Sequence, residues 1–241
     1  MRKLEWIQQL RTIAMLLVVV SHTCDYYIRS NYEIPPIWYG LVSCVITVAV
    51  PVFFILSGYL NVVSGQGVKK QFMKLGIPYI TWTFVYGMIG YYYLELPVSS
   101  FMGIFDLVTG YLHLYFIVAL LQLHLLYASV KENMDSNKIY GILLISASVT
   151  FGIYALAEIA IWVPGSSQDV ATKIFEPLFM KFGLTWGGFY FLGVFFAMRP
   201  KALKHLQDSI WQYCFLAVVC GGVHFVEYIT LLLRNDDVVV K

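Results

Sequence analysis

Arg11 and His22 have ten residues between them in an otherwise apolar stretch, a spacing that can place both on one face of a helix. Eleven steps of about 100° make three turns plus about 20°, over a rise of about 16 Å. Histidine can take a proton from a hydroxyl near neutral pH, so this pair predicts general base catalysis. The alternatives are that Arg11 extends to a membrane surface as an anchor and that His22 makes a hydrogen bond between helices.

A basic cluster of Lys69, Lys70 and Lys74 precedes another apolar stretch. Its ammonium groups could hold the phosphates of a soluble donor such as a coenzyme. The alternative is that they mark the cytoplasmic side of a membrane and contact anionic lipid.

The composition indicates that these residues belong to a membrane protein. Of 241 residues, 59% are hydrophobic and 12% are charged, against about 45–50% apolar and about 25% charged in an average soluble domain. A bilayer core needs about 20 apolar residues for each helical span. We therefore predict an all-α fold, a polytopic transmembrane helix bundle of about seven spans that forms one domain over residues 1–241. The predicted spans are Leu10 to Tyr27, Trp38 to Leu60, Ile77 to Leu96, Tyr111 to Val130, Ile139 to Val163, Phe182 to Met198 and Ile210 to Leu233.

Short polar connectors are expected between the spans, among them residues 64–74, 131–138 and 199–207. Lys and Arg favour cytoplasmic loops. A cytoplasmic amino terminus leaves five of the 16 basic residues outside, and 16 − 5 = 11 inside. The outer five are Arg29, Lys173, Lys181, Arg234 and Lys241. The first span lacks a small-residue cleavage site and is expected to stay as a helix. The net charge of +2 follows from this topology, so we infer no nucleic-acid partner.

His113 begins the fourth span and falls, like His22, in the outer half of the predicted bundle. Two histidines at similar depth can form one site, although His113 could also be an interfacial residue. In the second span, Ser57-Gly58 is expected to let two helices approach closely.

The remaining polar residues have plainer interpretations. His224 and Glu227 share a helix face and could form a buried pair, a metal site or a proton relay. We expect His124 to hydrogen-bond between helices, and Glu158 to lie at the membrane boundary or line a pore. The cysteines are expected to be buried free thiols; they are Cys24, Cys44, Cys214 and Cys220.

Four segments, in this order, resemble the acyltransferase-3 family. They are Arg11-x10-His22, Phe53-Phe54-Ile55-Leu56-Ser57-Gly58, the basic entry that ends in Ile77-Pro78-Tyr79, and His113-Leu114-Tyr115-Phe116. A later segment, Trp186 to Gly193, is similar to a later helix of that family. The resemblance runs from about Leu10 to Met198 and is to the branch that modifies bacterial cell-surface polysaccharides.

The resemblance implies transfer of an acyl group, usually acetyl from acetyl-CoA, to a hydroxyl of a lipid-linked or cell-surface glycan. His22 would be the catalytic histidine, Arg11 its partner and His113 a further catalytic residue. The donor would lie on the cytoplasmic side near Arg11, Lys70 and Lys74. Acyl-CoA would be a co-substrate and no cofactor would be bound permanently. A thioester already has a good leaving group, so no metal is expected. The location would be the bacterial cytoplasmic membrane.

The chain departs from the family pattern in three ways. Tyr115 replaces a Trp, and Gln71 and Lys74 stand where the family has a pair of arginines. Lysine attracts phosphate but lacks the planar fork of arginine. Family members commonly have about ten membrane helices, so a bundle of about seven is either part of a longer one or a short variant.

Two other functions share some of these features. A transporter or exporter of a glycan or small solute would also need intramembrane His, Arg and Glu, but the chain lacks the paired broken helices typical of transporters. A retinal protein is excluded because the predicted seventh span has no lysine for a Schiff base.

Overall fold

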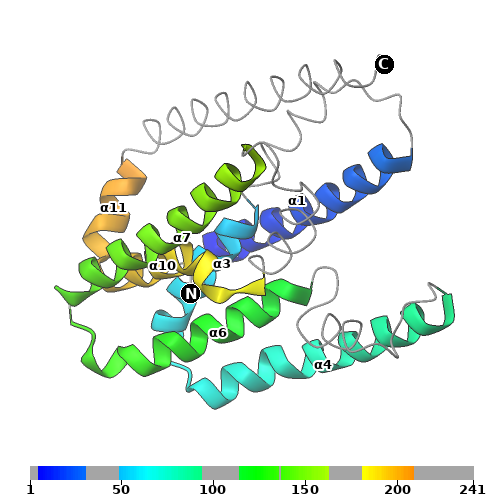
Figure 1. Ribbon diagram of the computed structural model, residues 1–241. Coiled ribbons are helices and arrows are strands. Elements are labelled where there is room, and N and C mark those ends of the chain that lie inside the picture. Colours follow the sequence, from blue (N-terminus) through cyan, green and yellow to red (C-terminus); the bar gives the residue numbers. More distant parts are fainter. Residues whose placement is uncertain (1–4, 31–48, 94–113, 136, 163–180, 209–241) are drawn as a thin grey trace. The chain divides into compact units, whose positions relative to one another are not determined.

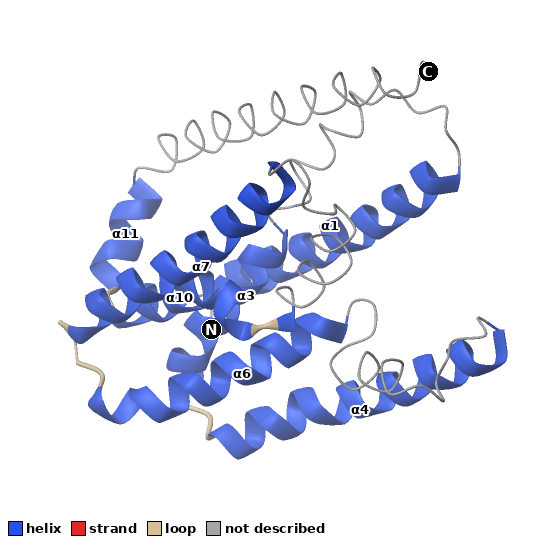
Figure 2. Cartoon of the chain, viewed as in Figure 1, coloured by secondary structure: helices blue, strands red, loops and turns tan. Residues whose placement is uncertain are grey.

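The computed structural model describes residues 5–30, 49–93, 114–135, 137–162 and 181–208 (Figure 1). Throughout these ranges the chain is helical apart from short connectors, and no strand occurs in them (Figure 2). The predicted all-α fold class is confirmed. The helices are α1 (Glu5–Ser30), α3 (Ala49–Ser64), α4 (Val68–Tyr93), α6 (Tyr115–Val130), η3 (Lys131–Asn133), α7 (Lys138–Trp162), η5 (Gly183–Trp186), α10 (Gly187–Met198) and α11 (Pro200–Asp208).

The predicted apolar segments agree with the helices to different degrees. One described helix is long and apolar enough to cross a membrane, over Lys138–Leu156. Three shorter apolar helical stretches are Ile7–Val20, Ala49–Ser64 and Gly183–Met198. The predicted span from Ile210 to Leu233 lies outside the described residues, so the number of spans stays a prediction.

Two of the predicted polar connectors are largely helical. Helix α4 begins at Val68, inside the connector expected over residues 64–74, and α11 covers most of the connector expected over residues 199–207. Hydrophobicity marks only the apolar part of a helix, whereas hydrogen bonding continues through lysine and glutamine, which are good helix formers. Pro200 occupies the first position of α11, where its missing N–H costs nothing.

The chain divides into two compact units. One comprises Ser57–Met198, and the other comprises Met1–Leu56 together with Arg199–Lys241. The single domain expected over the whole chain stays a prediction.

Glycine permits the closest helix contacts in the Ser57–Met198 unit. A Cβ atom on Gly58 of α3 would lie 3.2 Å from the Val194 nitrogen and closer still to the carbonyl oxygen of Tyr190, both in the α10 backbone. A Cβ on Gly188 would lie 3.0 Å from the Cα of Ala147 in α7. Small residues let backbones meet in this way, so the close approach expected at Ser57-Gly58 is confirmed for Gly58.

Two side chains hold the beginning of α10 in place. The amide of Gln122 in α6 accepts a hydrogen bond from the Gly183 N–H at 2.8 Å and donates to the Lys181 carbonyl at 3.2 Å. The hydroxyl of Thr150 in α7 accepts from the Gly188 N–H at 2.9 Å and donates to the Leu184 carbonyl at 3.3 Å. The bonds from Gly183 and Gly188 satisfy N–H groups that the starts of η5 and α10 leave without intrahelical partners.

The outward faces of the described helices carry large apolar side chains. Leu144 and Ile145 of α7 are 69% and 67% exposed, and Ile80 and Phe84 of α4 are each 69% exposed. Within the possible span in α7, only 11% of the residues are buried. A soluble monomer rarely exposes so much contiguous apolar surface.

The connector between α6 and α7 is organised by Asp135. One oxygen of its carboxylate accepts hydrogen bonds from the N–H groups of Lys138, at 2.7 Å, and Asn137, at 2.9 Å. These two bonds, in that order of importance, hold the pKa of Asp135 below its ordinary value, and the nearby Lys138 ammonium adds to the effect. The carboxylate therefore caps the start of α7.

We predict that Gly58→Ala destabilises the protein, by about 1–3 kcal/mol, because an added Cβ would overlap α10 backbone that cannot move aside cheaply. The matched control is Gly141→Ala in α7, where an added Cβ would meet nothing within 4 Å. Thermal unfolding in detergent checks both variants. Equal unfolding midpoints for native protein and Gly58→Ala would contradict the close crossing.

We predict that Asp135→Ala lowers the unfolding midpoint near pH 7 and has no effect in acid. A carboxylate whose pKa is depressed by folding stabilises the protein above its unfolded pKa, and this stability is lost as the pH falls through the folded pKa. Thermal unfolding of native and variant protein across this pH range is the measurement. A difference between the two that stays constant with pH would show that the cap does not act through the charged carboxylate.

Candidate functional site

Helix α1 carries the first two predicted site residues. It runs unbroken from Glu5 to Ser30, so Arg11 and His22 occupy one helix as predicted. Ile7 and Ala14 are its most buried side chains, at 1% and 2% exposure. At about 100° per residue, position 11 lies about 40° and position 22 about 60° from position 7 around the axis. Positions 11 and 22 therefore lie within about 20° of each other around the axis, on one side of α1.

The structure describes some of the predicted site residues in full, some by their backbone only and others not at all. Arg11 is exposed. The structure describes the helical backbone of His22 but not its side chain, and His113 lies outside the described residues. His224, Glu227, Cys44, Cys214 and Cys220 also lie outside them, and the side chains of Cys24 and Glu158 are not described.

The two predicted donor-binding lysines lie on the first turns of α4. Lys70 and Lys74 are both exposed. The Lys74 ammonium donates a hydrogen bond to the Gln66 side-chain oxygen at 2.8 Å. These lysines belong to the Ser57–Met198 unit and Arg11 belongs to the other unit.

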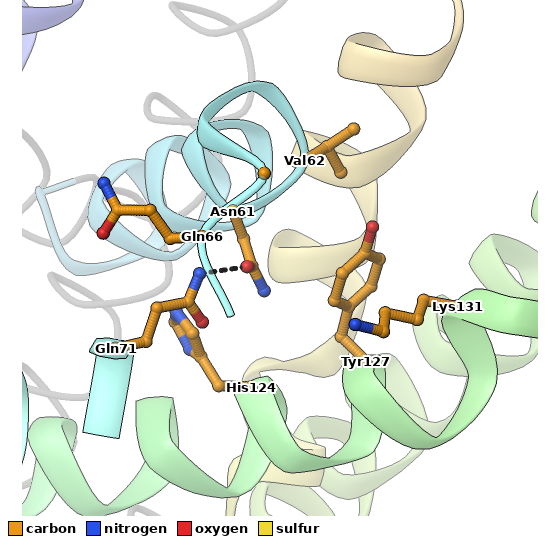
Figure 3. A pocket seen from close by; sticks show the side chains of 8 residues that line it. Asn61, Val62, Gln66, Gln71, His124, Tyr127 and Lys131 are labelled. Carbon is orange, nitrogen blue, oxygen red and sulfur yellow. Dashed lines mark hydrogen bonds between the residues drawn. The ribbon is translucent and has the colours of Figure 1, made fainter. Parts of the chain in front are cut away.

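A polar cavity of about 90 Å³ lies beside the turn between α3 and α4, within the Ser57–Met198 unit. It is bounded by the end of α3, the turn after it, the start of α4 and the end of α6 (Figure 3). One water needs about 10–15 Å³ of such space, so the cavity can hold several waters or the end of a slender ligand. The residues around it are Asn61, Val62, Gly65, Gln66, Gln71, His124, Tyr127 and Lys131.

A chain of buried side chains forms one wall of the cavity. The Gln71 amide donates to the Asn61 side-chain oxygen, shown as a dashed line in Figure 3. The Asn61 amide in turn donates to the Tyr190 hydroxyl. Asn61 is 7% exposed, Gln71 is 8% exposed and Tyr190 is fully buried. This chain, the Asn61–Gln71–Tyr190 network, links α3, α4 and α10 through directional bonds.

His124 presents one ring nitrogen to its own helix. Its Nδ1 lies 2.8 Å from the Leu120 carbonyl oxygen, and because a carbonyl only accepts, Nδ1 must carry the proton. In the neutral ring Nε2 is then an acceptor. The ring also contacts that of Tyr190, with centroids 5.5 Å apart. The expected hydrogen bond of His124 between helices is wrong, because this bond stays within α6. The contact of its ring with Tyr190 is what joins it to α10.

Gly65 shapes the turn at the mouth of the cavity. Its φ of +57° is the left-handed conformation that favours glycine, and its N–H donates to the Val62 carbonyl at 3.3 Å. This geometry ends α3 immediately after Ser64 and starts α4 within four residues. The short turn brings Asn61 and Gln71 together across it.

Sequence reasoning missed Asn61, Tyr127, Lys131 and Tyr190 as site residues. Asn61 left a usable signal, because a buried amide within a helix as apolar as α3 needs a hydrogen-bond partner. The partnership with Tyr190 left none, since the two residues are 129 positions apart. Among the described residues no group of three or more His, Cys, Asp or Glu side chains could hold a metal ion.

Comparison with known protein families identifies the chain. The model of the family described as an acyltransferase domain, Acyl_transf_3, matches residues 4–236. The chain belongs to the acyltransferase-3 family. Comparisons with curated proteins and with solved structures gave no significant match.

Family membership makes this chain an acyltransferase, and the groups that it transfers are acyl groups other than aminoacyl groups. Such an enzyme needs an acyl donor and an acceptor. The resemblance to other acyltransferase-3 proteins places the first arginine of their basic pair at Gln71. Here that position is buried and hydrogen-bonded to Asn61, so Gln71 contributes to the cavity wall rather than a surface charge.

We predict that Tyr190→Phe destabilises the protein by about 1–3 kcal/mol, because it leaves the buried Asn61 amide without its acceptor. Tyr154→Phe is the matched control, since the Tyr154 ring packs on Trp186 and its hydroxyl has no recorded hydrogen bond among the described residues. Thermal unfolding of both variants is the measurement. Equal effects of the two substitutions would show that the Tyr190 hydroxyl is not part of a stabilising network.

Proposed function

We propose that this chain is an integral membrane O-acyltransferase of the bacterial cytoplasmic membrane. It moves an acyl group, in the simplest case acetyl, from cytoplasmic acyl-CoA to a hydroxyl of a cell-surface or lipid-linked glycan. The observation that carries the proposal is the unbroken helix α1, which holds both Arg11 and His22, in a chain that matches the acyltransferase family over residues 4–236.

Two features of the described helices support a lipid environment. The first is the outward apolar surface of α1, α4 and α7, where Val19, Phe84 and Phe151 are 61%, 69% and 64% exposed. In water this surface would be unfavourable, whereas hydrocarbon chains would cover it at no cost.

The second feature is the hydrogen bonding of exposed hydroxyls. Each of four exposed Ser and Thr side chains donates to the carbonyl four residues earlier in its own helix, at 2.8–3.0 Å. Such bonds satisfy the hydroxyl where no water is present. The four residues are Thr12, Thr23, Thr81 and Ser129.

The proposed reaction uses His22 as the general base. Its imidazole takes the proton of the glycan hydroxyl while the hydroxyl oxygen attacks the thioester carbonyl. A carbon–oxygen bond forms, the carbon–sulfur bond breaks, and the proton passes to the departing CoA thiolate. Lys70 and Lys74 attract the donor phosphates, Arg11 is the partner of His22 on the same helix, and His113 is the further histidine.

We predict that His22→Ala lowers acyl transfer by about 10²-fold or more, the usual contribution of a general base. The assay mixes purified protein in lipid nanodiscs with radiolabelled acetyl-CoA and a crude lipid-linked glycan fraction. His205→Ala is the matched control, because His205 is exposed on α11 and has no assigned role. Equal transfer by native protein and His22→Ala would remove His22 from the mechanism, and no transfer by native protein would refute the proposed activity of this chain.

A further inference from the structure

The cavity beside α3, α4 and α6 carries an excess of positive charge. Its charged lining residue is Lys131, whose ammonium has no ion pair within the described ranges, and no carboxylate lines it. Lys74 lies next to it, hydrogen-bonded to the lining residue Gln66. Glu132 follows Lys131 in the chain and is exposed. Two ammonium groups beside a cavity without acids favour an anionic ligand, such as one with a phosphate.

The inner part of the cavity offers hydrogen-bond acceptors. The Gln71 amide uses its nitrogen on Asn61, which leaves its oxygen available. The proton of His124 points to Leu120, which leaves Nε2 available. A ligand that donates N–H groups would match this floor.

The lining thus combines two acceptors for N–H groups, on Gln71 and His124, with the exposed ammonium of Lys131. Figure 3 shows Gln71, His124 and Asn61 grouped on one side of the cavity and Lys131 beside Tyr127 on the other. At about 90 Å³, the space suits a slender arm and excludes a nucleotide. An acyl-CoA has this form, because a narrow pantetheine arm with two amide N–H groups leads away from its phosphates.

We propose that this cavity receives the amide-bearing arm of the acyl-CoA donor, with its N–H groups bonded to Gln71 and His124 and its phosphates held by Lys131. The inference deepens the proposed function and rests on acyl-CoA being the donor. It assigns donor binding to the end of α6, beyond the lysines of α4. The phosphate of phosphatidylglycerol shares the chemistry at Lys131, but this lipid has no N–H groups to bond to Gln71 and His124.

The test measures binding of desulfo-CoA, which keeps the arm and the phosphates but cannot carry an acyl group. Native protein, Lys131→Arg, Lys131→Gln and Lys131→Glu are compared in nanodiscs of zwitterionic lipid. We expect Lys131→Gln to weaken binding about tenfold, Lys131→Glu to weaken it further, and Lys131→Arg to retain it. The matched control is Lys201→Gln, an exposed lysine of α11 that does not line the cavity. Lys131 is exposed, so unchanged unfolding midpoints should confirm that its variants fold.

Adenosine 3′,5′-bisphosphate, which has phosphates but no arm, distinguishes the two parts of the site. We expect it to bind more weakly than desulfo-CoA and to remain sensitive to Lys131→Gln. Equal binding of desulfo-CoA by Lys131→Gln and Lys201→Gln would overturn the proposal, as would no binding by native protein. The same measurement is repeated in nanodiscs of anionic glycerol phospholipid. Loss of desulfo-CoA binding by native protein there would overturn the proposal and assign the site to lipid phosphate.

This experiment separates the inference from the proposed catalysis. Desulfo-CoA binding requires neither an acceptor nor His22, so His22→Ala should bind it as native protein does. Binding that depends on Lys131 in a protein that transfers no label would support the cavity assignment while refuting the activity. Label transfer that is lost in His22→Ala, with binding indifferent to Lys131, would support the activity and overturn the cavity assignment.

Discussion

The hydrogen-bond chain from Gln71 through Asn61 to Tyr190 is the interaction on which the Ser57–Met198 unit depends. It can form because Gly58, one turn before Asn61, lets α3 approach the α10 backbone closely. A buried amide without partners is costly, so the chain favours one arrangement of α3, α4 and α10 over others. The same bonds fix which polar atoms face the cavity, and packing and site therefore have a common cause.

The outer surface of the Ser57–Met198 unit is apolar, in contrast to the polar network inside it. Ile80, Leu144 and Ile145 are all more than half exposed, and hydroxyls such as Thr81 bond to their own helix. Nonpolar packing between helices gains little in lipid, because lipid tails are as apolar as leucine. Small-residue contacts and internal polar bonds must then supply specificity, and this unit contains both.

Much of the helical fold was predictable, and the polar cavity was not. Long apolar runs reveal α1 and α7, and the 3.6-residue period correctly joins Arg11 and His22 on one helix. Hydropathy does not reveal α11 or the early start of α4, because amphipathic helices at a surface lack a long apolar run. The contact of Asn61 with Tyr190 depends on tertiary packing, which no local pattern encodes. His113 lies outside the described residues, so its predicted role is untested.

A double-mutant cycle on Gln71 and Tyr190 tests the network most directly. Gln71→Met and Tyr190→Phe each remove one of the two bonds to Asn61, and the unfolding free energy is measured for the native protein, both single variants and the double variant. If the three residues form one network, the two effects are not additive, with a coupling energy of about 0.5 kcal/mol or more. Additive effects would show that the two bonds are independent and would contradict a shared origin of packing and site.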